Sequence, residues 1–326
     1  MKCTVTEETF DWFASFWESR DNNLRWDTVF VLPPWLRVWQ AAFAPQSSPS
    51  FLVAREGESV IGIAPLLIVD GKASVAGSPD VCDYADFVVA PGKETIFSTA
   101  LLDALKHRGV RLLDLRSVRP DSTAVSSVVE AARARGYDVA SNREDVSLET
   151  DLPPTWEAYL GLLSSKQRHE VRRKLRRLEE AGSVSYRFIE DSDAVPGFMD
   201  TFLAMFVESR DDKAAFMTGD MEAFFRSMAT AMSRAGLLRL GVLDLDEAPV
   251  AAIITFDFND VIYLYNSAFD PEYRSLSVGV LSKVLCLKDS IERGKKRFDF
   301  LKGDERYKYH LGGQEVELHR YQIAIA

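Results

Sequence analysis

Residues 261–309 constrain the fold of this chain more than any other stretch of its sequence. They begin with a run rich in β-branched and aromatic residues, which is typical of a buried strand. A polar turn follows at Glu272–Ser277, and Gly279 then opens an amphipathic helix that ends at Gly294. A second apolar strand, Phe298–Leu301, comes after the helix. The stretch therefore predicts a strand–turn–helix–strand unit of an α/β protein.

The turn before this helix predicts a site for an anion. A helix start leaves backbone N–H groups without intrahelical acceptors, and the helix dipole places partial positive charge there. Both effects favour a negatively charged group such as a pyrophosphate. Arg274 lies within the turn and can add a side-chain charge at the same position. The alternative is an ordinary connection between a strand and a helix, because Gly and Ser are common at such junctions.

Length and hydrophobic pattern predict two domains of ordinary size. The chain has 326 residues, of which 47% are hydrophobic, and this is enough for two sizeable cores. The second half shows the order β-α-α-β-β-β-α-β-loop-β, and the first half repeats it more loosely. We expect an N-terminal domain at 1–160, a basic connecting helix at 161–183 and a C-terminal domain at 184–326. Both domains should be of the α/β (α+β) class, each with a mixed central sheet flanked by helices.

The individual elements follow from helical periodicity and from runs of strand-forming residues. In the second half we expect strands at 184–190, 237–245, 250–258, 261–269, 297–301 and 316–325, and helices at 194–210, 220–235 and 278–293. In the first half we expect helices at 12–19, 35–43, 94–108 and 124–135, and strands at 51–55, 59–69, 74–76, 84–89, 111–116 and 145–148.

Charge and cysteine content exclude several classes of protein. The net charge of −10 argues against a large nucleic-acid surface, because such domains are usually basic. Three cysteines far apart fit a reducing compartment, and the four histidines lack metal-ligand spacing, so we expect no bound metal. The N-terminus lacks the pattern of a signal peptide, and no apolar run approaches the ~20 residues of a membrane helix. We therefore expect a cytoplasmic protein without a membrane span, whose oligomeric state stays open.

A strongly basic helix is predicted at Leu162–Gly182. Ser164 and Gln167 match a capping box, and Gly182 is placed to end the helix. The polar face carries seven cations, some of them one turn apart, where like charges repel by a few tenths of a kcal/mol per pair. This face is either solvated or opposite an anion: a sugar phosphate, the 3′-phosphate of coenzyme A (CoA), or the acceptor arm of a tRNA. The cations are Lys166, Arg168, Arg172, Arg173, Lys174, Arg176 and Arg177.

Two further groups of polar residues are candidates for substrate contact or catalysis. The first follows the strand Phe298–Leu301 and comprises Lys302, Asp304, Glu305, Tyr307 and Lys308. Ligands tend to bind at the carboxyl ends of strands in open α/β sheets, and a carboxylate there can accept a proton from an attacking amine. The alternative for this loop is a cluster of salt bridges.

The second group is Tyr84 and Asp86, which share one face of a predicted strand while Asp83 points away. Such a pair can bind a polar acceptor such as an amino sugar. The alternative is an edge strand whose charges deter aggregation.

The residues of 261–309 resemble the GNAT acyltransferase fold. In GNAT enzymes an Arg/Gln-x-x-Gly-x-Gly/Ala loop holds the pyrophosphate of acyl-CoA, and Arg274–Gly279 matches this loop with Ser277 in place of the first glycine. The run DFLKGDERYKY, residues 299–309, resembles the branch named for cellulose and exopolysaccharide biosynthesis, whose acetyltransferase domain is BioF2-like. That branch is related to the Fem-type aminoacyl transferases. The fold implied is a pair of tandem GNAT-like domains, the first of them degenerate, because Val89–Lys93 stands where its CoA loop would be.

The resemblance implies an N-acyltransferase that moves an acyl group, as in acetyl-CoA, to a small-molecule or glycan amine, for example an amino sugar of the cell envelope. Asp304 or Glu305 would be the base, Tyr307 or Tyr309 would protonate the thiolate, Lys308 would stabilise negative charge, and Lys302 would contact substrate. Alternatives are a Fem-like transferase that uses aminoacyl-tRNA, and a scaffold without activity. The residues implied for the acyl-CoA are Ser267, Ala268, Phe269, Arg274, Ser275, Ser277, Val278 and Gly279.

Overall fold

In this computed structural model the chain forms two compact units, which we describe one at a time. The first comprises Met1–Val146 and Val316–Ala326, and the second comprises Ser147–Glu315. The structure describes residues 3–19, 22–46, 48–77, 80–209 and 211–325. The division falls within strand β7 (Asp138–Asp151) and strand β13 (Gln314–Ala324), so each of these strands contributes to both units.

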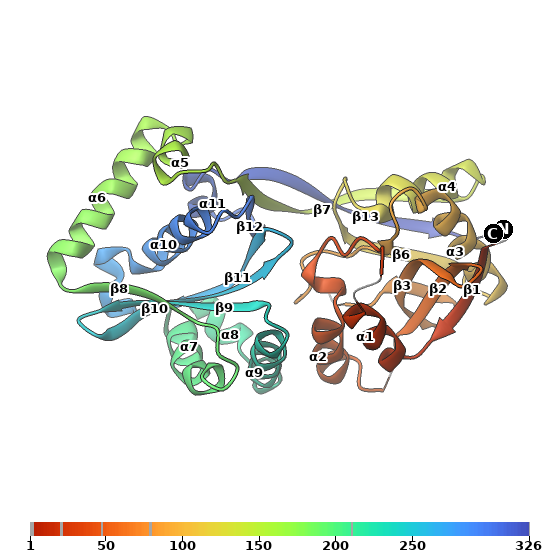
Figure 1. Ribbon diagram of the computed structural model, residues 1–326, viewed down its shortest axis with the longest axis horizontal. Coiled ribbons are helices and arrows are strands. Elements are labelled where there is room, and N and C mark those ends of the chain that lie inside the picture. The colour runs from red at the N-terminus through yellow and green to blue at the C-terminus, as the bar shows by residue number, and fades with distance from the viewer. Residues whose placement is uncertain (1–2, 20–21, 47, 78–79, 210, 326) are drawn as a thin grey trace. The chain divides into compact units, whose positions relative to one another are not determined.

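The first unit is a mixed sheet with helices on both faces (Figure 1). Strands β1 to β4 form an antiparallel meander, β4 pairs in parallel with β6, and β6 pairs antiparallel with the end of β13. Helices α3 and α4 cover one face and α1 and α2 the other. The elements are β1 (Cys3–Glu8), α1 (Phe10–Glu18), η1 (Val29–Val31), α2 (Pro33–Phe43), β2 (Ser50–Glu56), β3 (Ser59–Val69), β4 (Lys72–Val75), β5 (Val88–Val89), α3 (Glu94–His107), β6 (Leu112–Val118), η2 (Ala124–Val129) and α4 (Glu130–Ala134).

The second unit has the same plan. Strands β8 to β11 form an antiparallel meander, β11 pairs in parallel with β12, and β12 pairs antiparallel with the end of β7. Helix α10 lies on one face beside α5 and α6, whereas α7, α8 and α9 lie on the other (Figure 1). The elements are α5 (Trp156–Leu162), α6 (Ser165–Ala181), β8 (Val184–Ile189), α7 (Val195–Ser209), α8 (Asp211–Phe216), α9 (Gly219–Arg234), β9 (Leu238–Leu245), β10 (Ala248–Phe258), β11 (Val261–Phe269), η3 (Pro271–Leu276), α10 (Val278–Glu292), β12 (Arg297–Lys302) and α11 (Arg306–His310).

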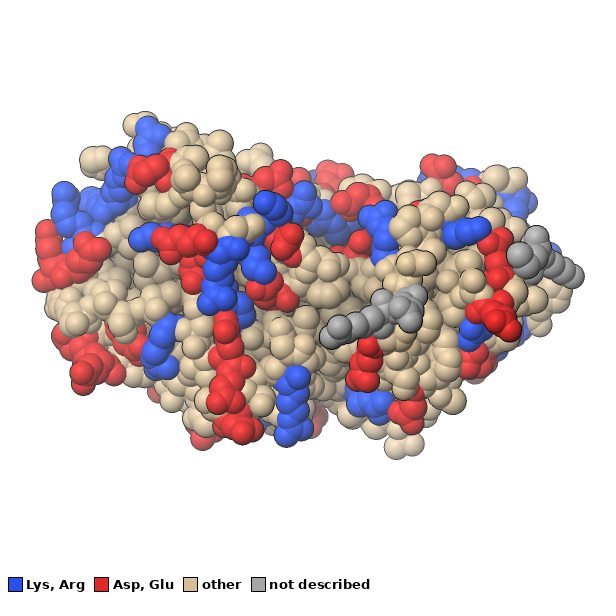
Figure 2. Space-filling model, in the orientation of Figure 1, with Lys and Arg blue, Asp and Glu red and all other residues tan. Residues whose placement is uncertain are grey.

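Helix α6 is the predicted basic helix, and its structure confirms the predicted capping residues at both ends. The Ser164 hydroxyl accepts the Gln167 N–H at 3.3 Å, and the Gln167 side chain accepts the Ser164 N–H at 3.0 Å. The helix ends at Gly182, and Val171 and Leu178 form its buried side. Figure 2 shows acidic side chains interspersed among the basic ones along this helix.

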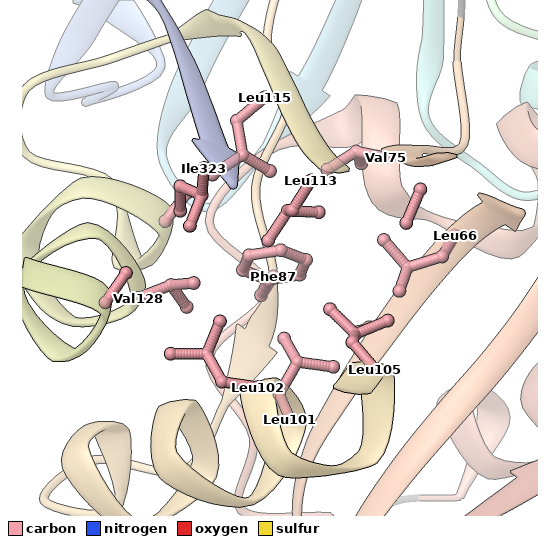
Figure 3. Close-up of a cluster of buried hydrophobic side chains, with 14 of the residues drawn as sticks. Leu66, Val75, Phe87, Leu101, Leu102, Leu105, Leu113, Leu115, Val128 and Ile323 are labelled. Carbon is pink, nitrogen blue, oxygen red and sulfur yellow. The ribbon is translucent and has the colours of Figure 1, made fainter. Parts of the chain in front are cut away.

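The core of the first unit lies between its sheet and helices α3 and η2 (Figure 3). Leu113 and Leu115 point into it from β6, and Leu102 and Leu105 come from α3. Because side chains alternate along a strand, residues 114 and 116 of β6 project from the opposite face of the sheet.

Each unit contains one pair of parallel neighbours joined through a long helix. In the first unit β4 and β6 are joined through α3, and in the second β11 and β12 are joined through α10. The two units therefore share their strand order, which confirms the expected tandem arrangement, each unit with mixed strands flanked by helices.

The predicted domain boundaries differ from the division seen in the structure. Residues 161–183 are no separate connector, because α6 packs against α10 within the second unit. The C-terminal strand passes into the first unit, where Ile323 pairs with Leu113 of β6. Periodicity marks where a strand lies but not which strand it pairs with. The sequence therefore carried no signal that the end of β13 pairs in the first unit and the end of β7 in the second.

Most predicted elements lie within a few residues of those observed. The strand expected at 84–89 is reduced to Val88–Val89, because the Asp86 carboxylate binds the N–H of Phe87 and competes with strand pairing. Strand β1 and helices α5, α8 and α11 were not predicted. The helix expected at 194–210 corresponds to α7, and Arg210 lies outside the described residues.

Candidate functional site

The start of α10 has the geometry that an anion site needs. Ser277 adopts a left-handed conformation, with φ of 62° and ψ of 31°, and its carbonyl accepts the N–H groups of Val280 and Leu281 at 3.0 Å. The N–H groups of Val278 and Gly279 therefore lie at the open end of the helix. A left-handed residue other than glycine costs about 1–2 kcal/mol, which explains why GNAT loops favour glycine at this position.

Arg274 and Gly279 fix how this helix start lies against strand β11. The Arg274 side chain is exposed, donates to the Ser209 carbonyl at 3.4 Å and has its guanidinium carbon 5.9 Å from the Phe269 ring centre. A Cβ atom added to Gly279 would lie 2.9 Å from the Phe269 ring, so the close approach of helix and strand requires glycine.

Strands β11 and β12 separate beside this helix start. Their parallel pairing covers Val261 to Tyr263 of β11, whereas Leu264 and residues 266–269 pair with β10. The Ser267 N–H donates to the Asn266 side chain at 3.0 Å, and the Ser267 carbonyl accepts from the Lys213 ammonium. Both backbone groups of Ser267 are thus bound by side chains, in the region where the resemblance placed a donor to the acyl carbonyl.

The loop after β12 is closed by Lys308. This lysine is buried, and its ammonium donates to the carbonyls of Leu301, Lys302 and Gly303 and pairs with Glu305 at 2.8 Å. For Lys308 and Glu305 this arrangement matches the alternative given for this loop, a cluster of salt bridges. Asp304 is exposed, and Lys302 is half-buried. Tyr309 donates its hydroxyl hydrogen to Glu315.

A buried lysine that the sequence reading missed lies next to this loop. Lys283 of α10 is 5% exposed, donates to the Gly279 carbonyl at 2.7 Å and lies 4.9 Å from the Tyr307 ring centre. Burial, and then the charges of Lys213 and Lys308, lower its pKa to about 7, although Glu305 raises it. The sequence signal was available, because Lys283 is the one charged residue in the run 278–287.

A cavity of about 550 Å³ opens along the first turns of α10, between α6 and α11. Its apolar lining includes Val280, Leu281 and Val284, whereas its charged lining has the cations Lys166, Lys174 and Arg306 and the single acid Glu170. Burial, and then the charges of these three cations, lower the pKa of His310 in the same lining. The cavity therefore fits a ligand with an apolar body and negative charge.

The arginines of α6 are largely paired with acids of the same unit. Arg172 pairs with Glu157 at 2.7 Å, and Arg173 pairs with Glu170 at 2.8 Å. These pairs offset the repulsion expected between adjacent turns. Lys166 and Lys174 of the helix line the cavity, where Lys174 pairs with Glu170 at 3.6 Å.

Tyr84 and Asp86 belong to the first unit, and both are buried. The Asp86 carboxylate accepts the N–H groups of Phe87, Thr123 and Ala124 at 2.8, 3.1 and 2.8 Å. Burial raises its pKa to about 7 although these bonds lower it. This carboxylate therefore holds the start of η2, which is a different role from the substrate contact predicted for it.

Comparisons with known proteins agree with this geometry. Residues 165–309 match the model of the acetyltransferase (GNAT) domain family. The fold is similar to that of FemX, with a TM-score of 0.68 at 14% identity over 97% of this chain and 96% of that one. It is also similar to a conserved protein of unknown function from Bacteroides thetaiotaomicron (TM-score 0.58, 14% identity, 98% and 99% covered) and to L-PGS from Bacillus licheniformis (0.54, 10%, 88% and 90%). Among curated proteins, none matches the chain.

Two possible features do not occur in the part of the chain that the structure describes. No helix there combines the length and the apolar character needed to cross a membrane. The described His, Cys, Asp and Glu residues form no group of three or more that could hold a metal ion.

Proposed function

We propose that the protein is an N-acyltransferase that moves an acyl group from acyl-CoA, with acetyl-CoA as the first candidate, to an amine. The observation that carries this proposal is the open helix start at Val278 and Gly279, beside the separated strands β11 and β12. Within a segment that matches a GNAT domain, this is where a pyrophosphate and an extended thioester arm would bind.

The donor would be held at three places. The pyrophosphate would accept the N–H groups of Val278 and Gly279 and a hydrogen bond from Arg274, which is exposed and lies in the turn before this helix. Ser275 and Ser277 would add backbone or hydroxyl donors. A backbone N–H between Ser267 and Phe269 would polarise the thioester carbonyl. The nucleotide end would occupy the cavity beside α10, with its phosphate at Lys166 and Lys174.

The reaction would be a direct transfer. The amine nitrogen attacks the thioester carbon, the C–N bond forms and the C–S bond breaks. The amine proton passes to Asp304 or Glu305, and the departing thiolate takes a proton from Tyr307 or Tyr309. Asp304 is favoured as the base, because Glu305 already pairs with Lys308. Lys308 can stabilise negative charge only if it releases one of its present partners. Lys283 is a further proton acceptor.

The acceptor is proposed from the resemblance of residues 299–309 to the polysaccharide branch of the family. An amino sugar of a surface polysaccharide has the amine that the reaction needs. Lys302 at the end of β12 would contact it.

A Fem-like transferase that uses aminoacyl-tRNA is the second candidate. The likeness to FemX and the cations that line the cavity beside α6 favour it. Saturable binding of acyl-CoA supports the first candidate, and tRNA affinity that falls steeply with salt supports the second. A chain that binds neither ligand would be a scaffold.

Charge reversal at Arg274 tests the donor site. Arg274→Glu should weaken acyl-CoA binding by roughly 10- to 100-fold, the scale of a lost charge-assisted contact. Isothermal titration with acetyl-CoA measures it. Arg234→Glu is the matched control, because Arg234 is an exposed arginine in the last turn of α9. Equal affinity of wild type and a folded Arg274→Glu variant would remove the assignment of this helix start.

A further inference from the structure

The two units have similar structures where their parallel strands end. Parallel pairing ends at Ser74 and Asp114 in the first unit, and at Tyr263 and Asp299 in the second. Both aspartates are buried, each 2% exposed. A residue with positive φ follows each of them, Ser117 at 53° and Leu301 at 59°. The first unit therefore has a counterpart of the place where the second unit separates its strands.

A cavity of about 250 Å³ lies at this place in the first unit. The residues that line it come from the ends of β4 and β6, the segment after β4, and β13. Ligands in open α/β sheets bind beyond the carboxyl ends of parallel strands, and this cavity has that position. The residues are Lys72, Ser74, Val75, Ala76, Gly77, Cys82, Tyr84, Ala85, Asp114, Arg116, Ser117 and Arg320.

Two acids, the buried Asp114 and the partly buried Glu144, hold three cations at this cavity. Asp114 accepts two hydrogen bonds from Arg320, both at 2.8 Å, and pairs with Lys72 at 2.8 Å. Burial alone would raise the pKa of Asp114, but Arg320 and Lys72 bring it below its ordinary value, so the carboxylate stays charged. Glu144 accepts from the Nε of Arg116 at 2.6 Å and from the Ser117 N–H at 2.7 Å.

These acids orient the cations without covering them. The side chains of Lys72, Arg116 and Arg320 remain 49%, 46% and 31% exposed. Each keeps further N–H donors beyond those its acid uses, because an ammonium has three and a guanidinium five. Three cations thus meet two carboxylates, Asp114 in the lining and Glu144 behind Arg116, in a chain whose net charge is −10. Preorganised donors of this kind recognise phosphate and carboxylate groups.

The ligand must be compact. The volume is below the roughly 300 Å³ at which small-molecule sites usually begin. The start of α3 differs from that of α10, because Lys93 there has a φ of −108° where Ser277 has 62°, and the Lys93 ammonium pairs with Glu56 at 2.5 Å. These features exclude a nucleotide-sized donor from this cavity.

We propose that the first unit holds a second ligand site, in which Lys72, Arg116 and Arg320 bind the phosphate or carboxylate group of a compact molecule. This site is independent of the acyl-donor site in the second unit. The other explanation is an ion-pair network that only joins β4, β6 and β13.

Titration calorimetry with inorganic phosphate and with succinate, on the full chain at constant ionic strength set by sodium chloride, separates the two explanations. We expect saturable binding of at least one probe, weakened about tenfold or more in Lys72→Gln and in Arg116→Gln. Lys72→Gln leaves the two bonds between Asp114 and Arg320 in place, so its fold should persist. Arg143→Gln is the control, because Arg143 is an exposed arginine of the same unit outside the cavity.

Stronger binding of phosphate identifies a phosphate-bearing ligand, and stronger binding of succinate identifies a carboxylate. The proposal is overturned if neither probe saturates, or if all three variants bind as the wild type does. A melting curve for each variant shows that it is folded. Acetyl-CoA affinity should be unchanged in all of them, so failure here is distinct from failure of the donor site.

Discussion

Replacing Lys283 by methionine should stabilise the protein, because the folded wild-type protein holds the Lys283 amine away from water. Burial and the nearby cations bring its pKa from 10.5 to about 7. That difference corresponds to about 5 kcal/mol of destabilisation below pH 7, where the folded protein must carry the charge. Methionine keeps the apolar stem and removes the ammonium.

The gain should depend on pH with a definite sign. Between pH 7 and 10 the folded protein binds fewer protons at Lys283 than the unfolded chain, so the unfolding free energy rises with pH by up to about 1.4 kcal/mol per unit. The penalty is therefore full below pH 7 and declines toward pH 10.5. Lys283→Met should gain about 5 kcal/mol at pH 6 and about 2 kcal/mol at pH 9.

Urea unfolding of wild type and variant at several pH values measures this difference. Lys288→Met is the control, because Lys288 lies on the same helix, is 45% exposed and pairs with Glu292. It should change the unfolding free energy little at any pH. If the gain from Lys283→Met is the same at pH 6 and pH 9, then Lys283 is not desolvated as described. Turnover measured on the same variant shows whether its amine also accepts a proton in catalysis.

Variants of the loop after β12 and of helix α6 test the rest of the proposed function. Asp304→Asn should lower kcat by at least about tenfold and leave acyl-CoA affinity nearly unchanged, because a general base contributes about 10²–10⁴-fold. If both Asp304→Asn and Glu305→Gln keep full turnover at neutral pH, the base is another residue, and Lys283 is the next candidate. Replacing four arginines of α6 by glutamine should leave turnover and stability nearly unchanged, since ion pairs between exposed side chains stabilise a fold only weakly. Loss of tRNA binding together with its salt dependence would instead favour the Fem-like candidate. The four are Arg172, Arg173, Arg176 and Arg177.

Local signals predicted local structure well. The Ser164–Gln167 capping box, the helix start at Val278 and the strand Val261–Phe269 lie where the sequence placed them. Each of these depends on residues within a few positions of one another. The same reasoning found the helix start of the candidate donor site.

Contacts between distant positions could not be predicted in this way. Arg172 pairs with Glu157, and Asp86 accepts N–H groups 37 and 38 residues away. The sequence therefore did not show that acids neutralise part of the basic face of α6. It also did not show that the Asp86 carboxylate is already bound by backbone N–H groups. Lys283 was missed because helical periodicity marks an apolar face but does not show that a lysine within it lacks a path to solvent.

Because the two units share one plan, the differences between their strand ends point to different ligands. Both place a buried aspartate at the last parallel pair, yet the surroundings have diverged. In the second unit the loop after Asp299 is closed by Lys308, and the helix start carries Arg274. In the first unit Asp114 itself binds two cations that face a cavity. If the second unit binds the acyl donor, the site at Asp114 can take a ligand of different size without competing for it. A duplicated fold that has kept the opening but changed its charges is expected when each copy binds a different molecule, and the Lys72→Gln and Arg274→Glu variants should then impair two separable binding events.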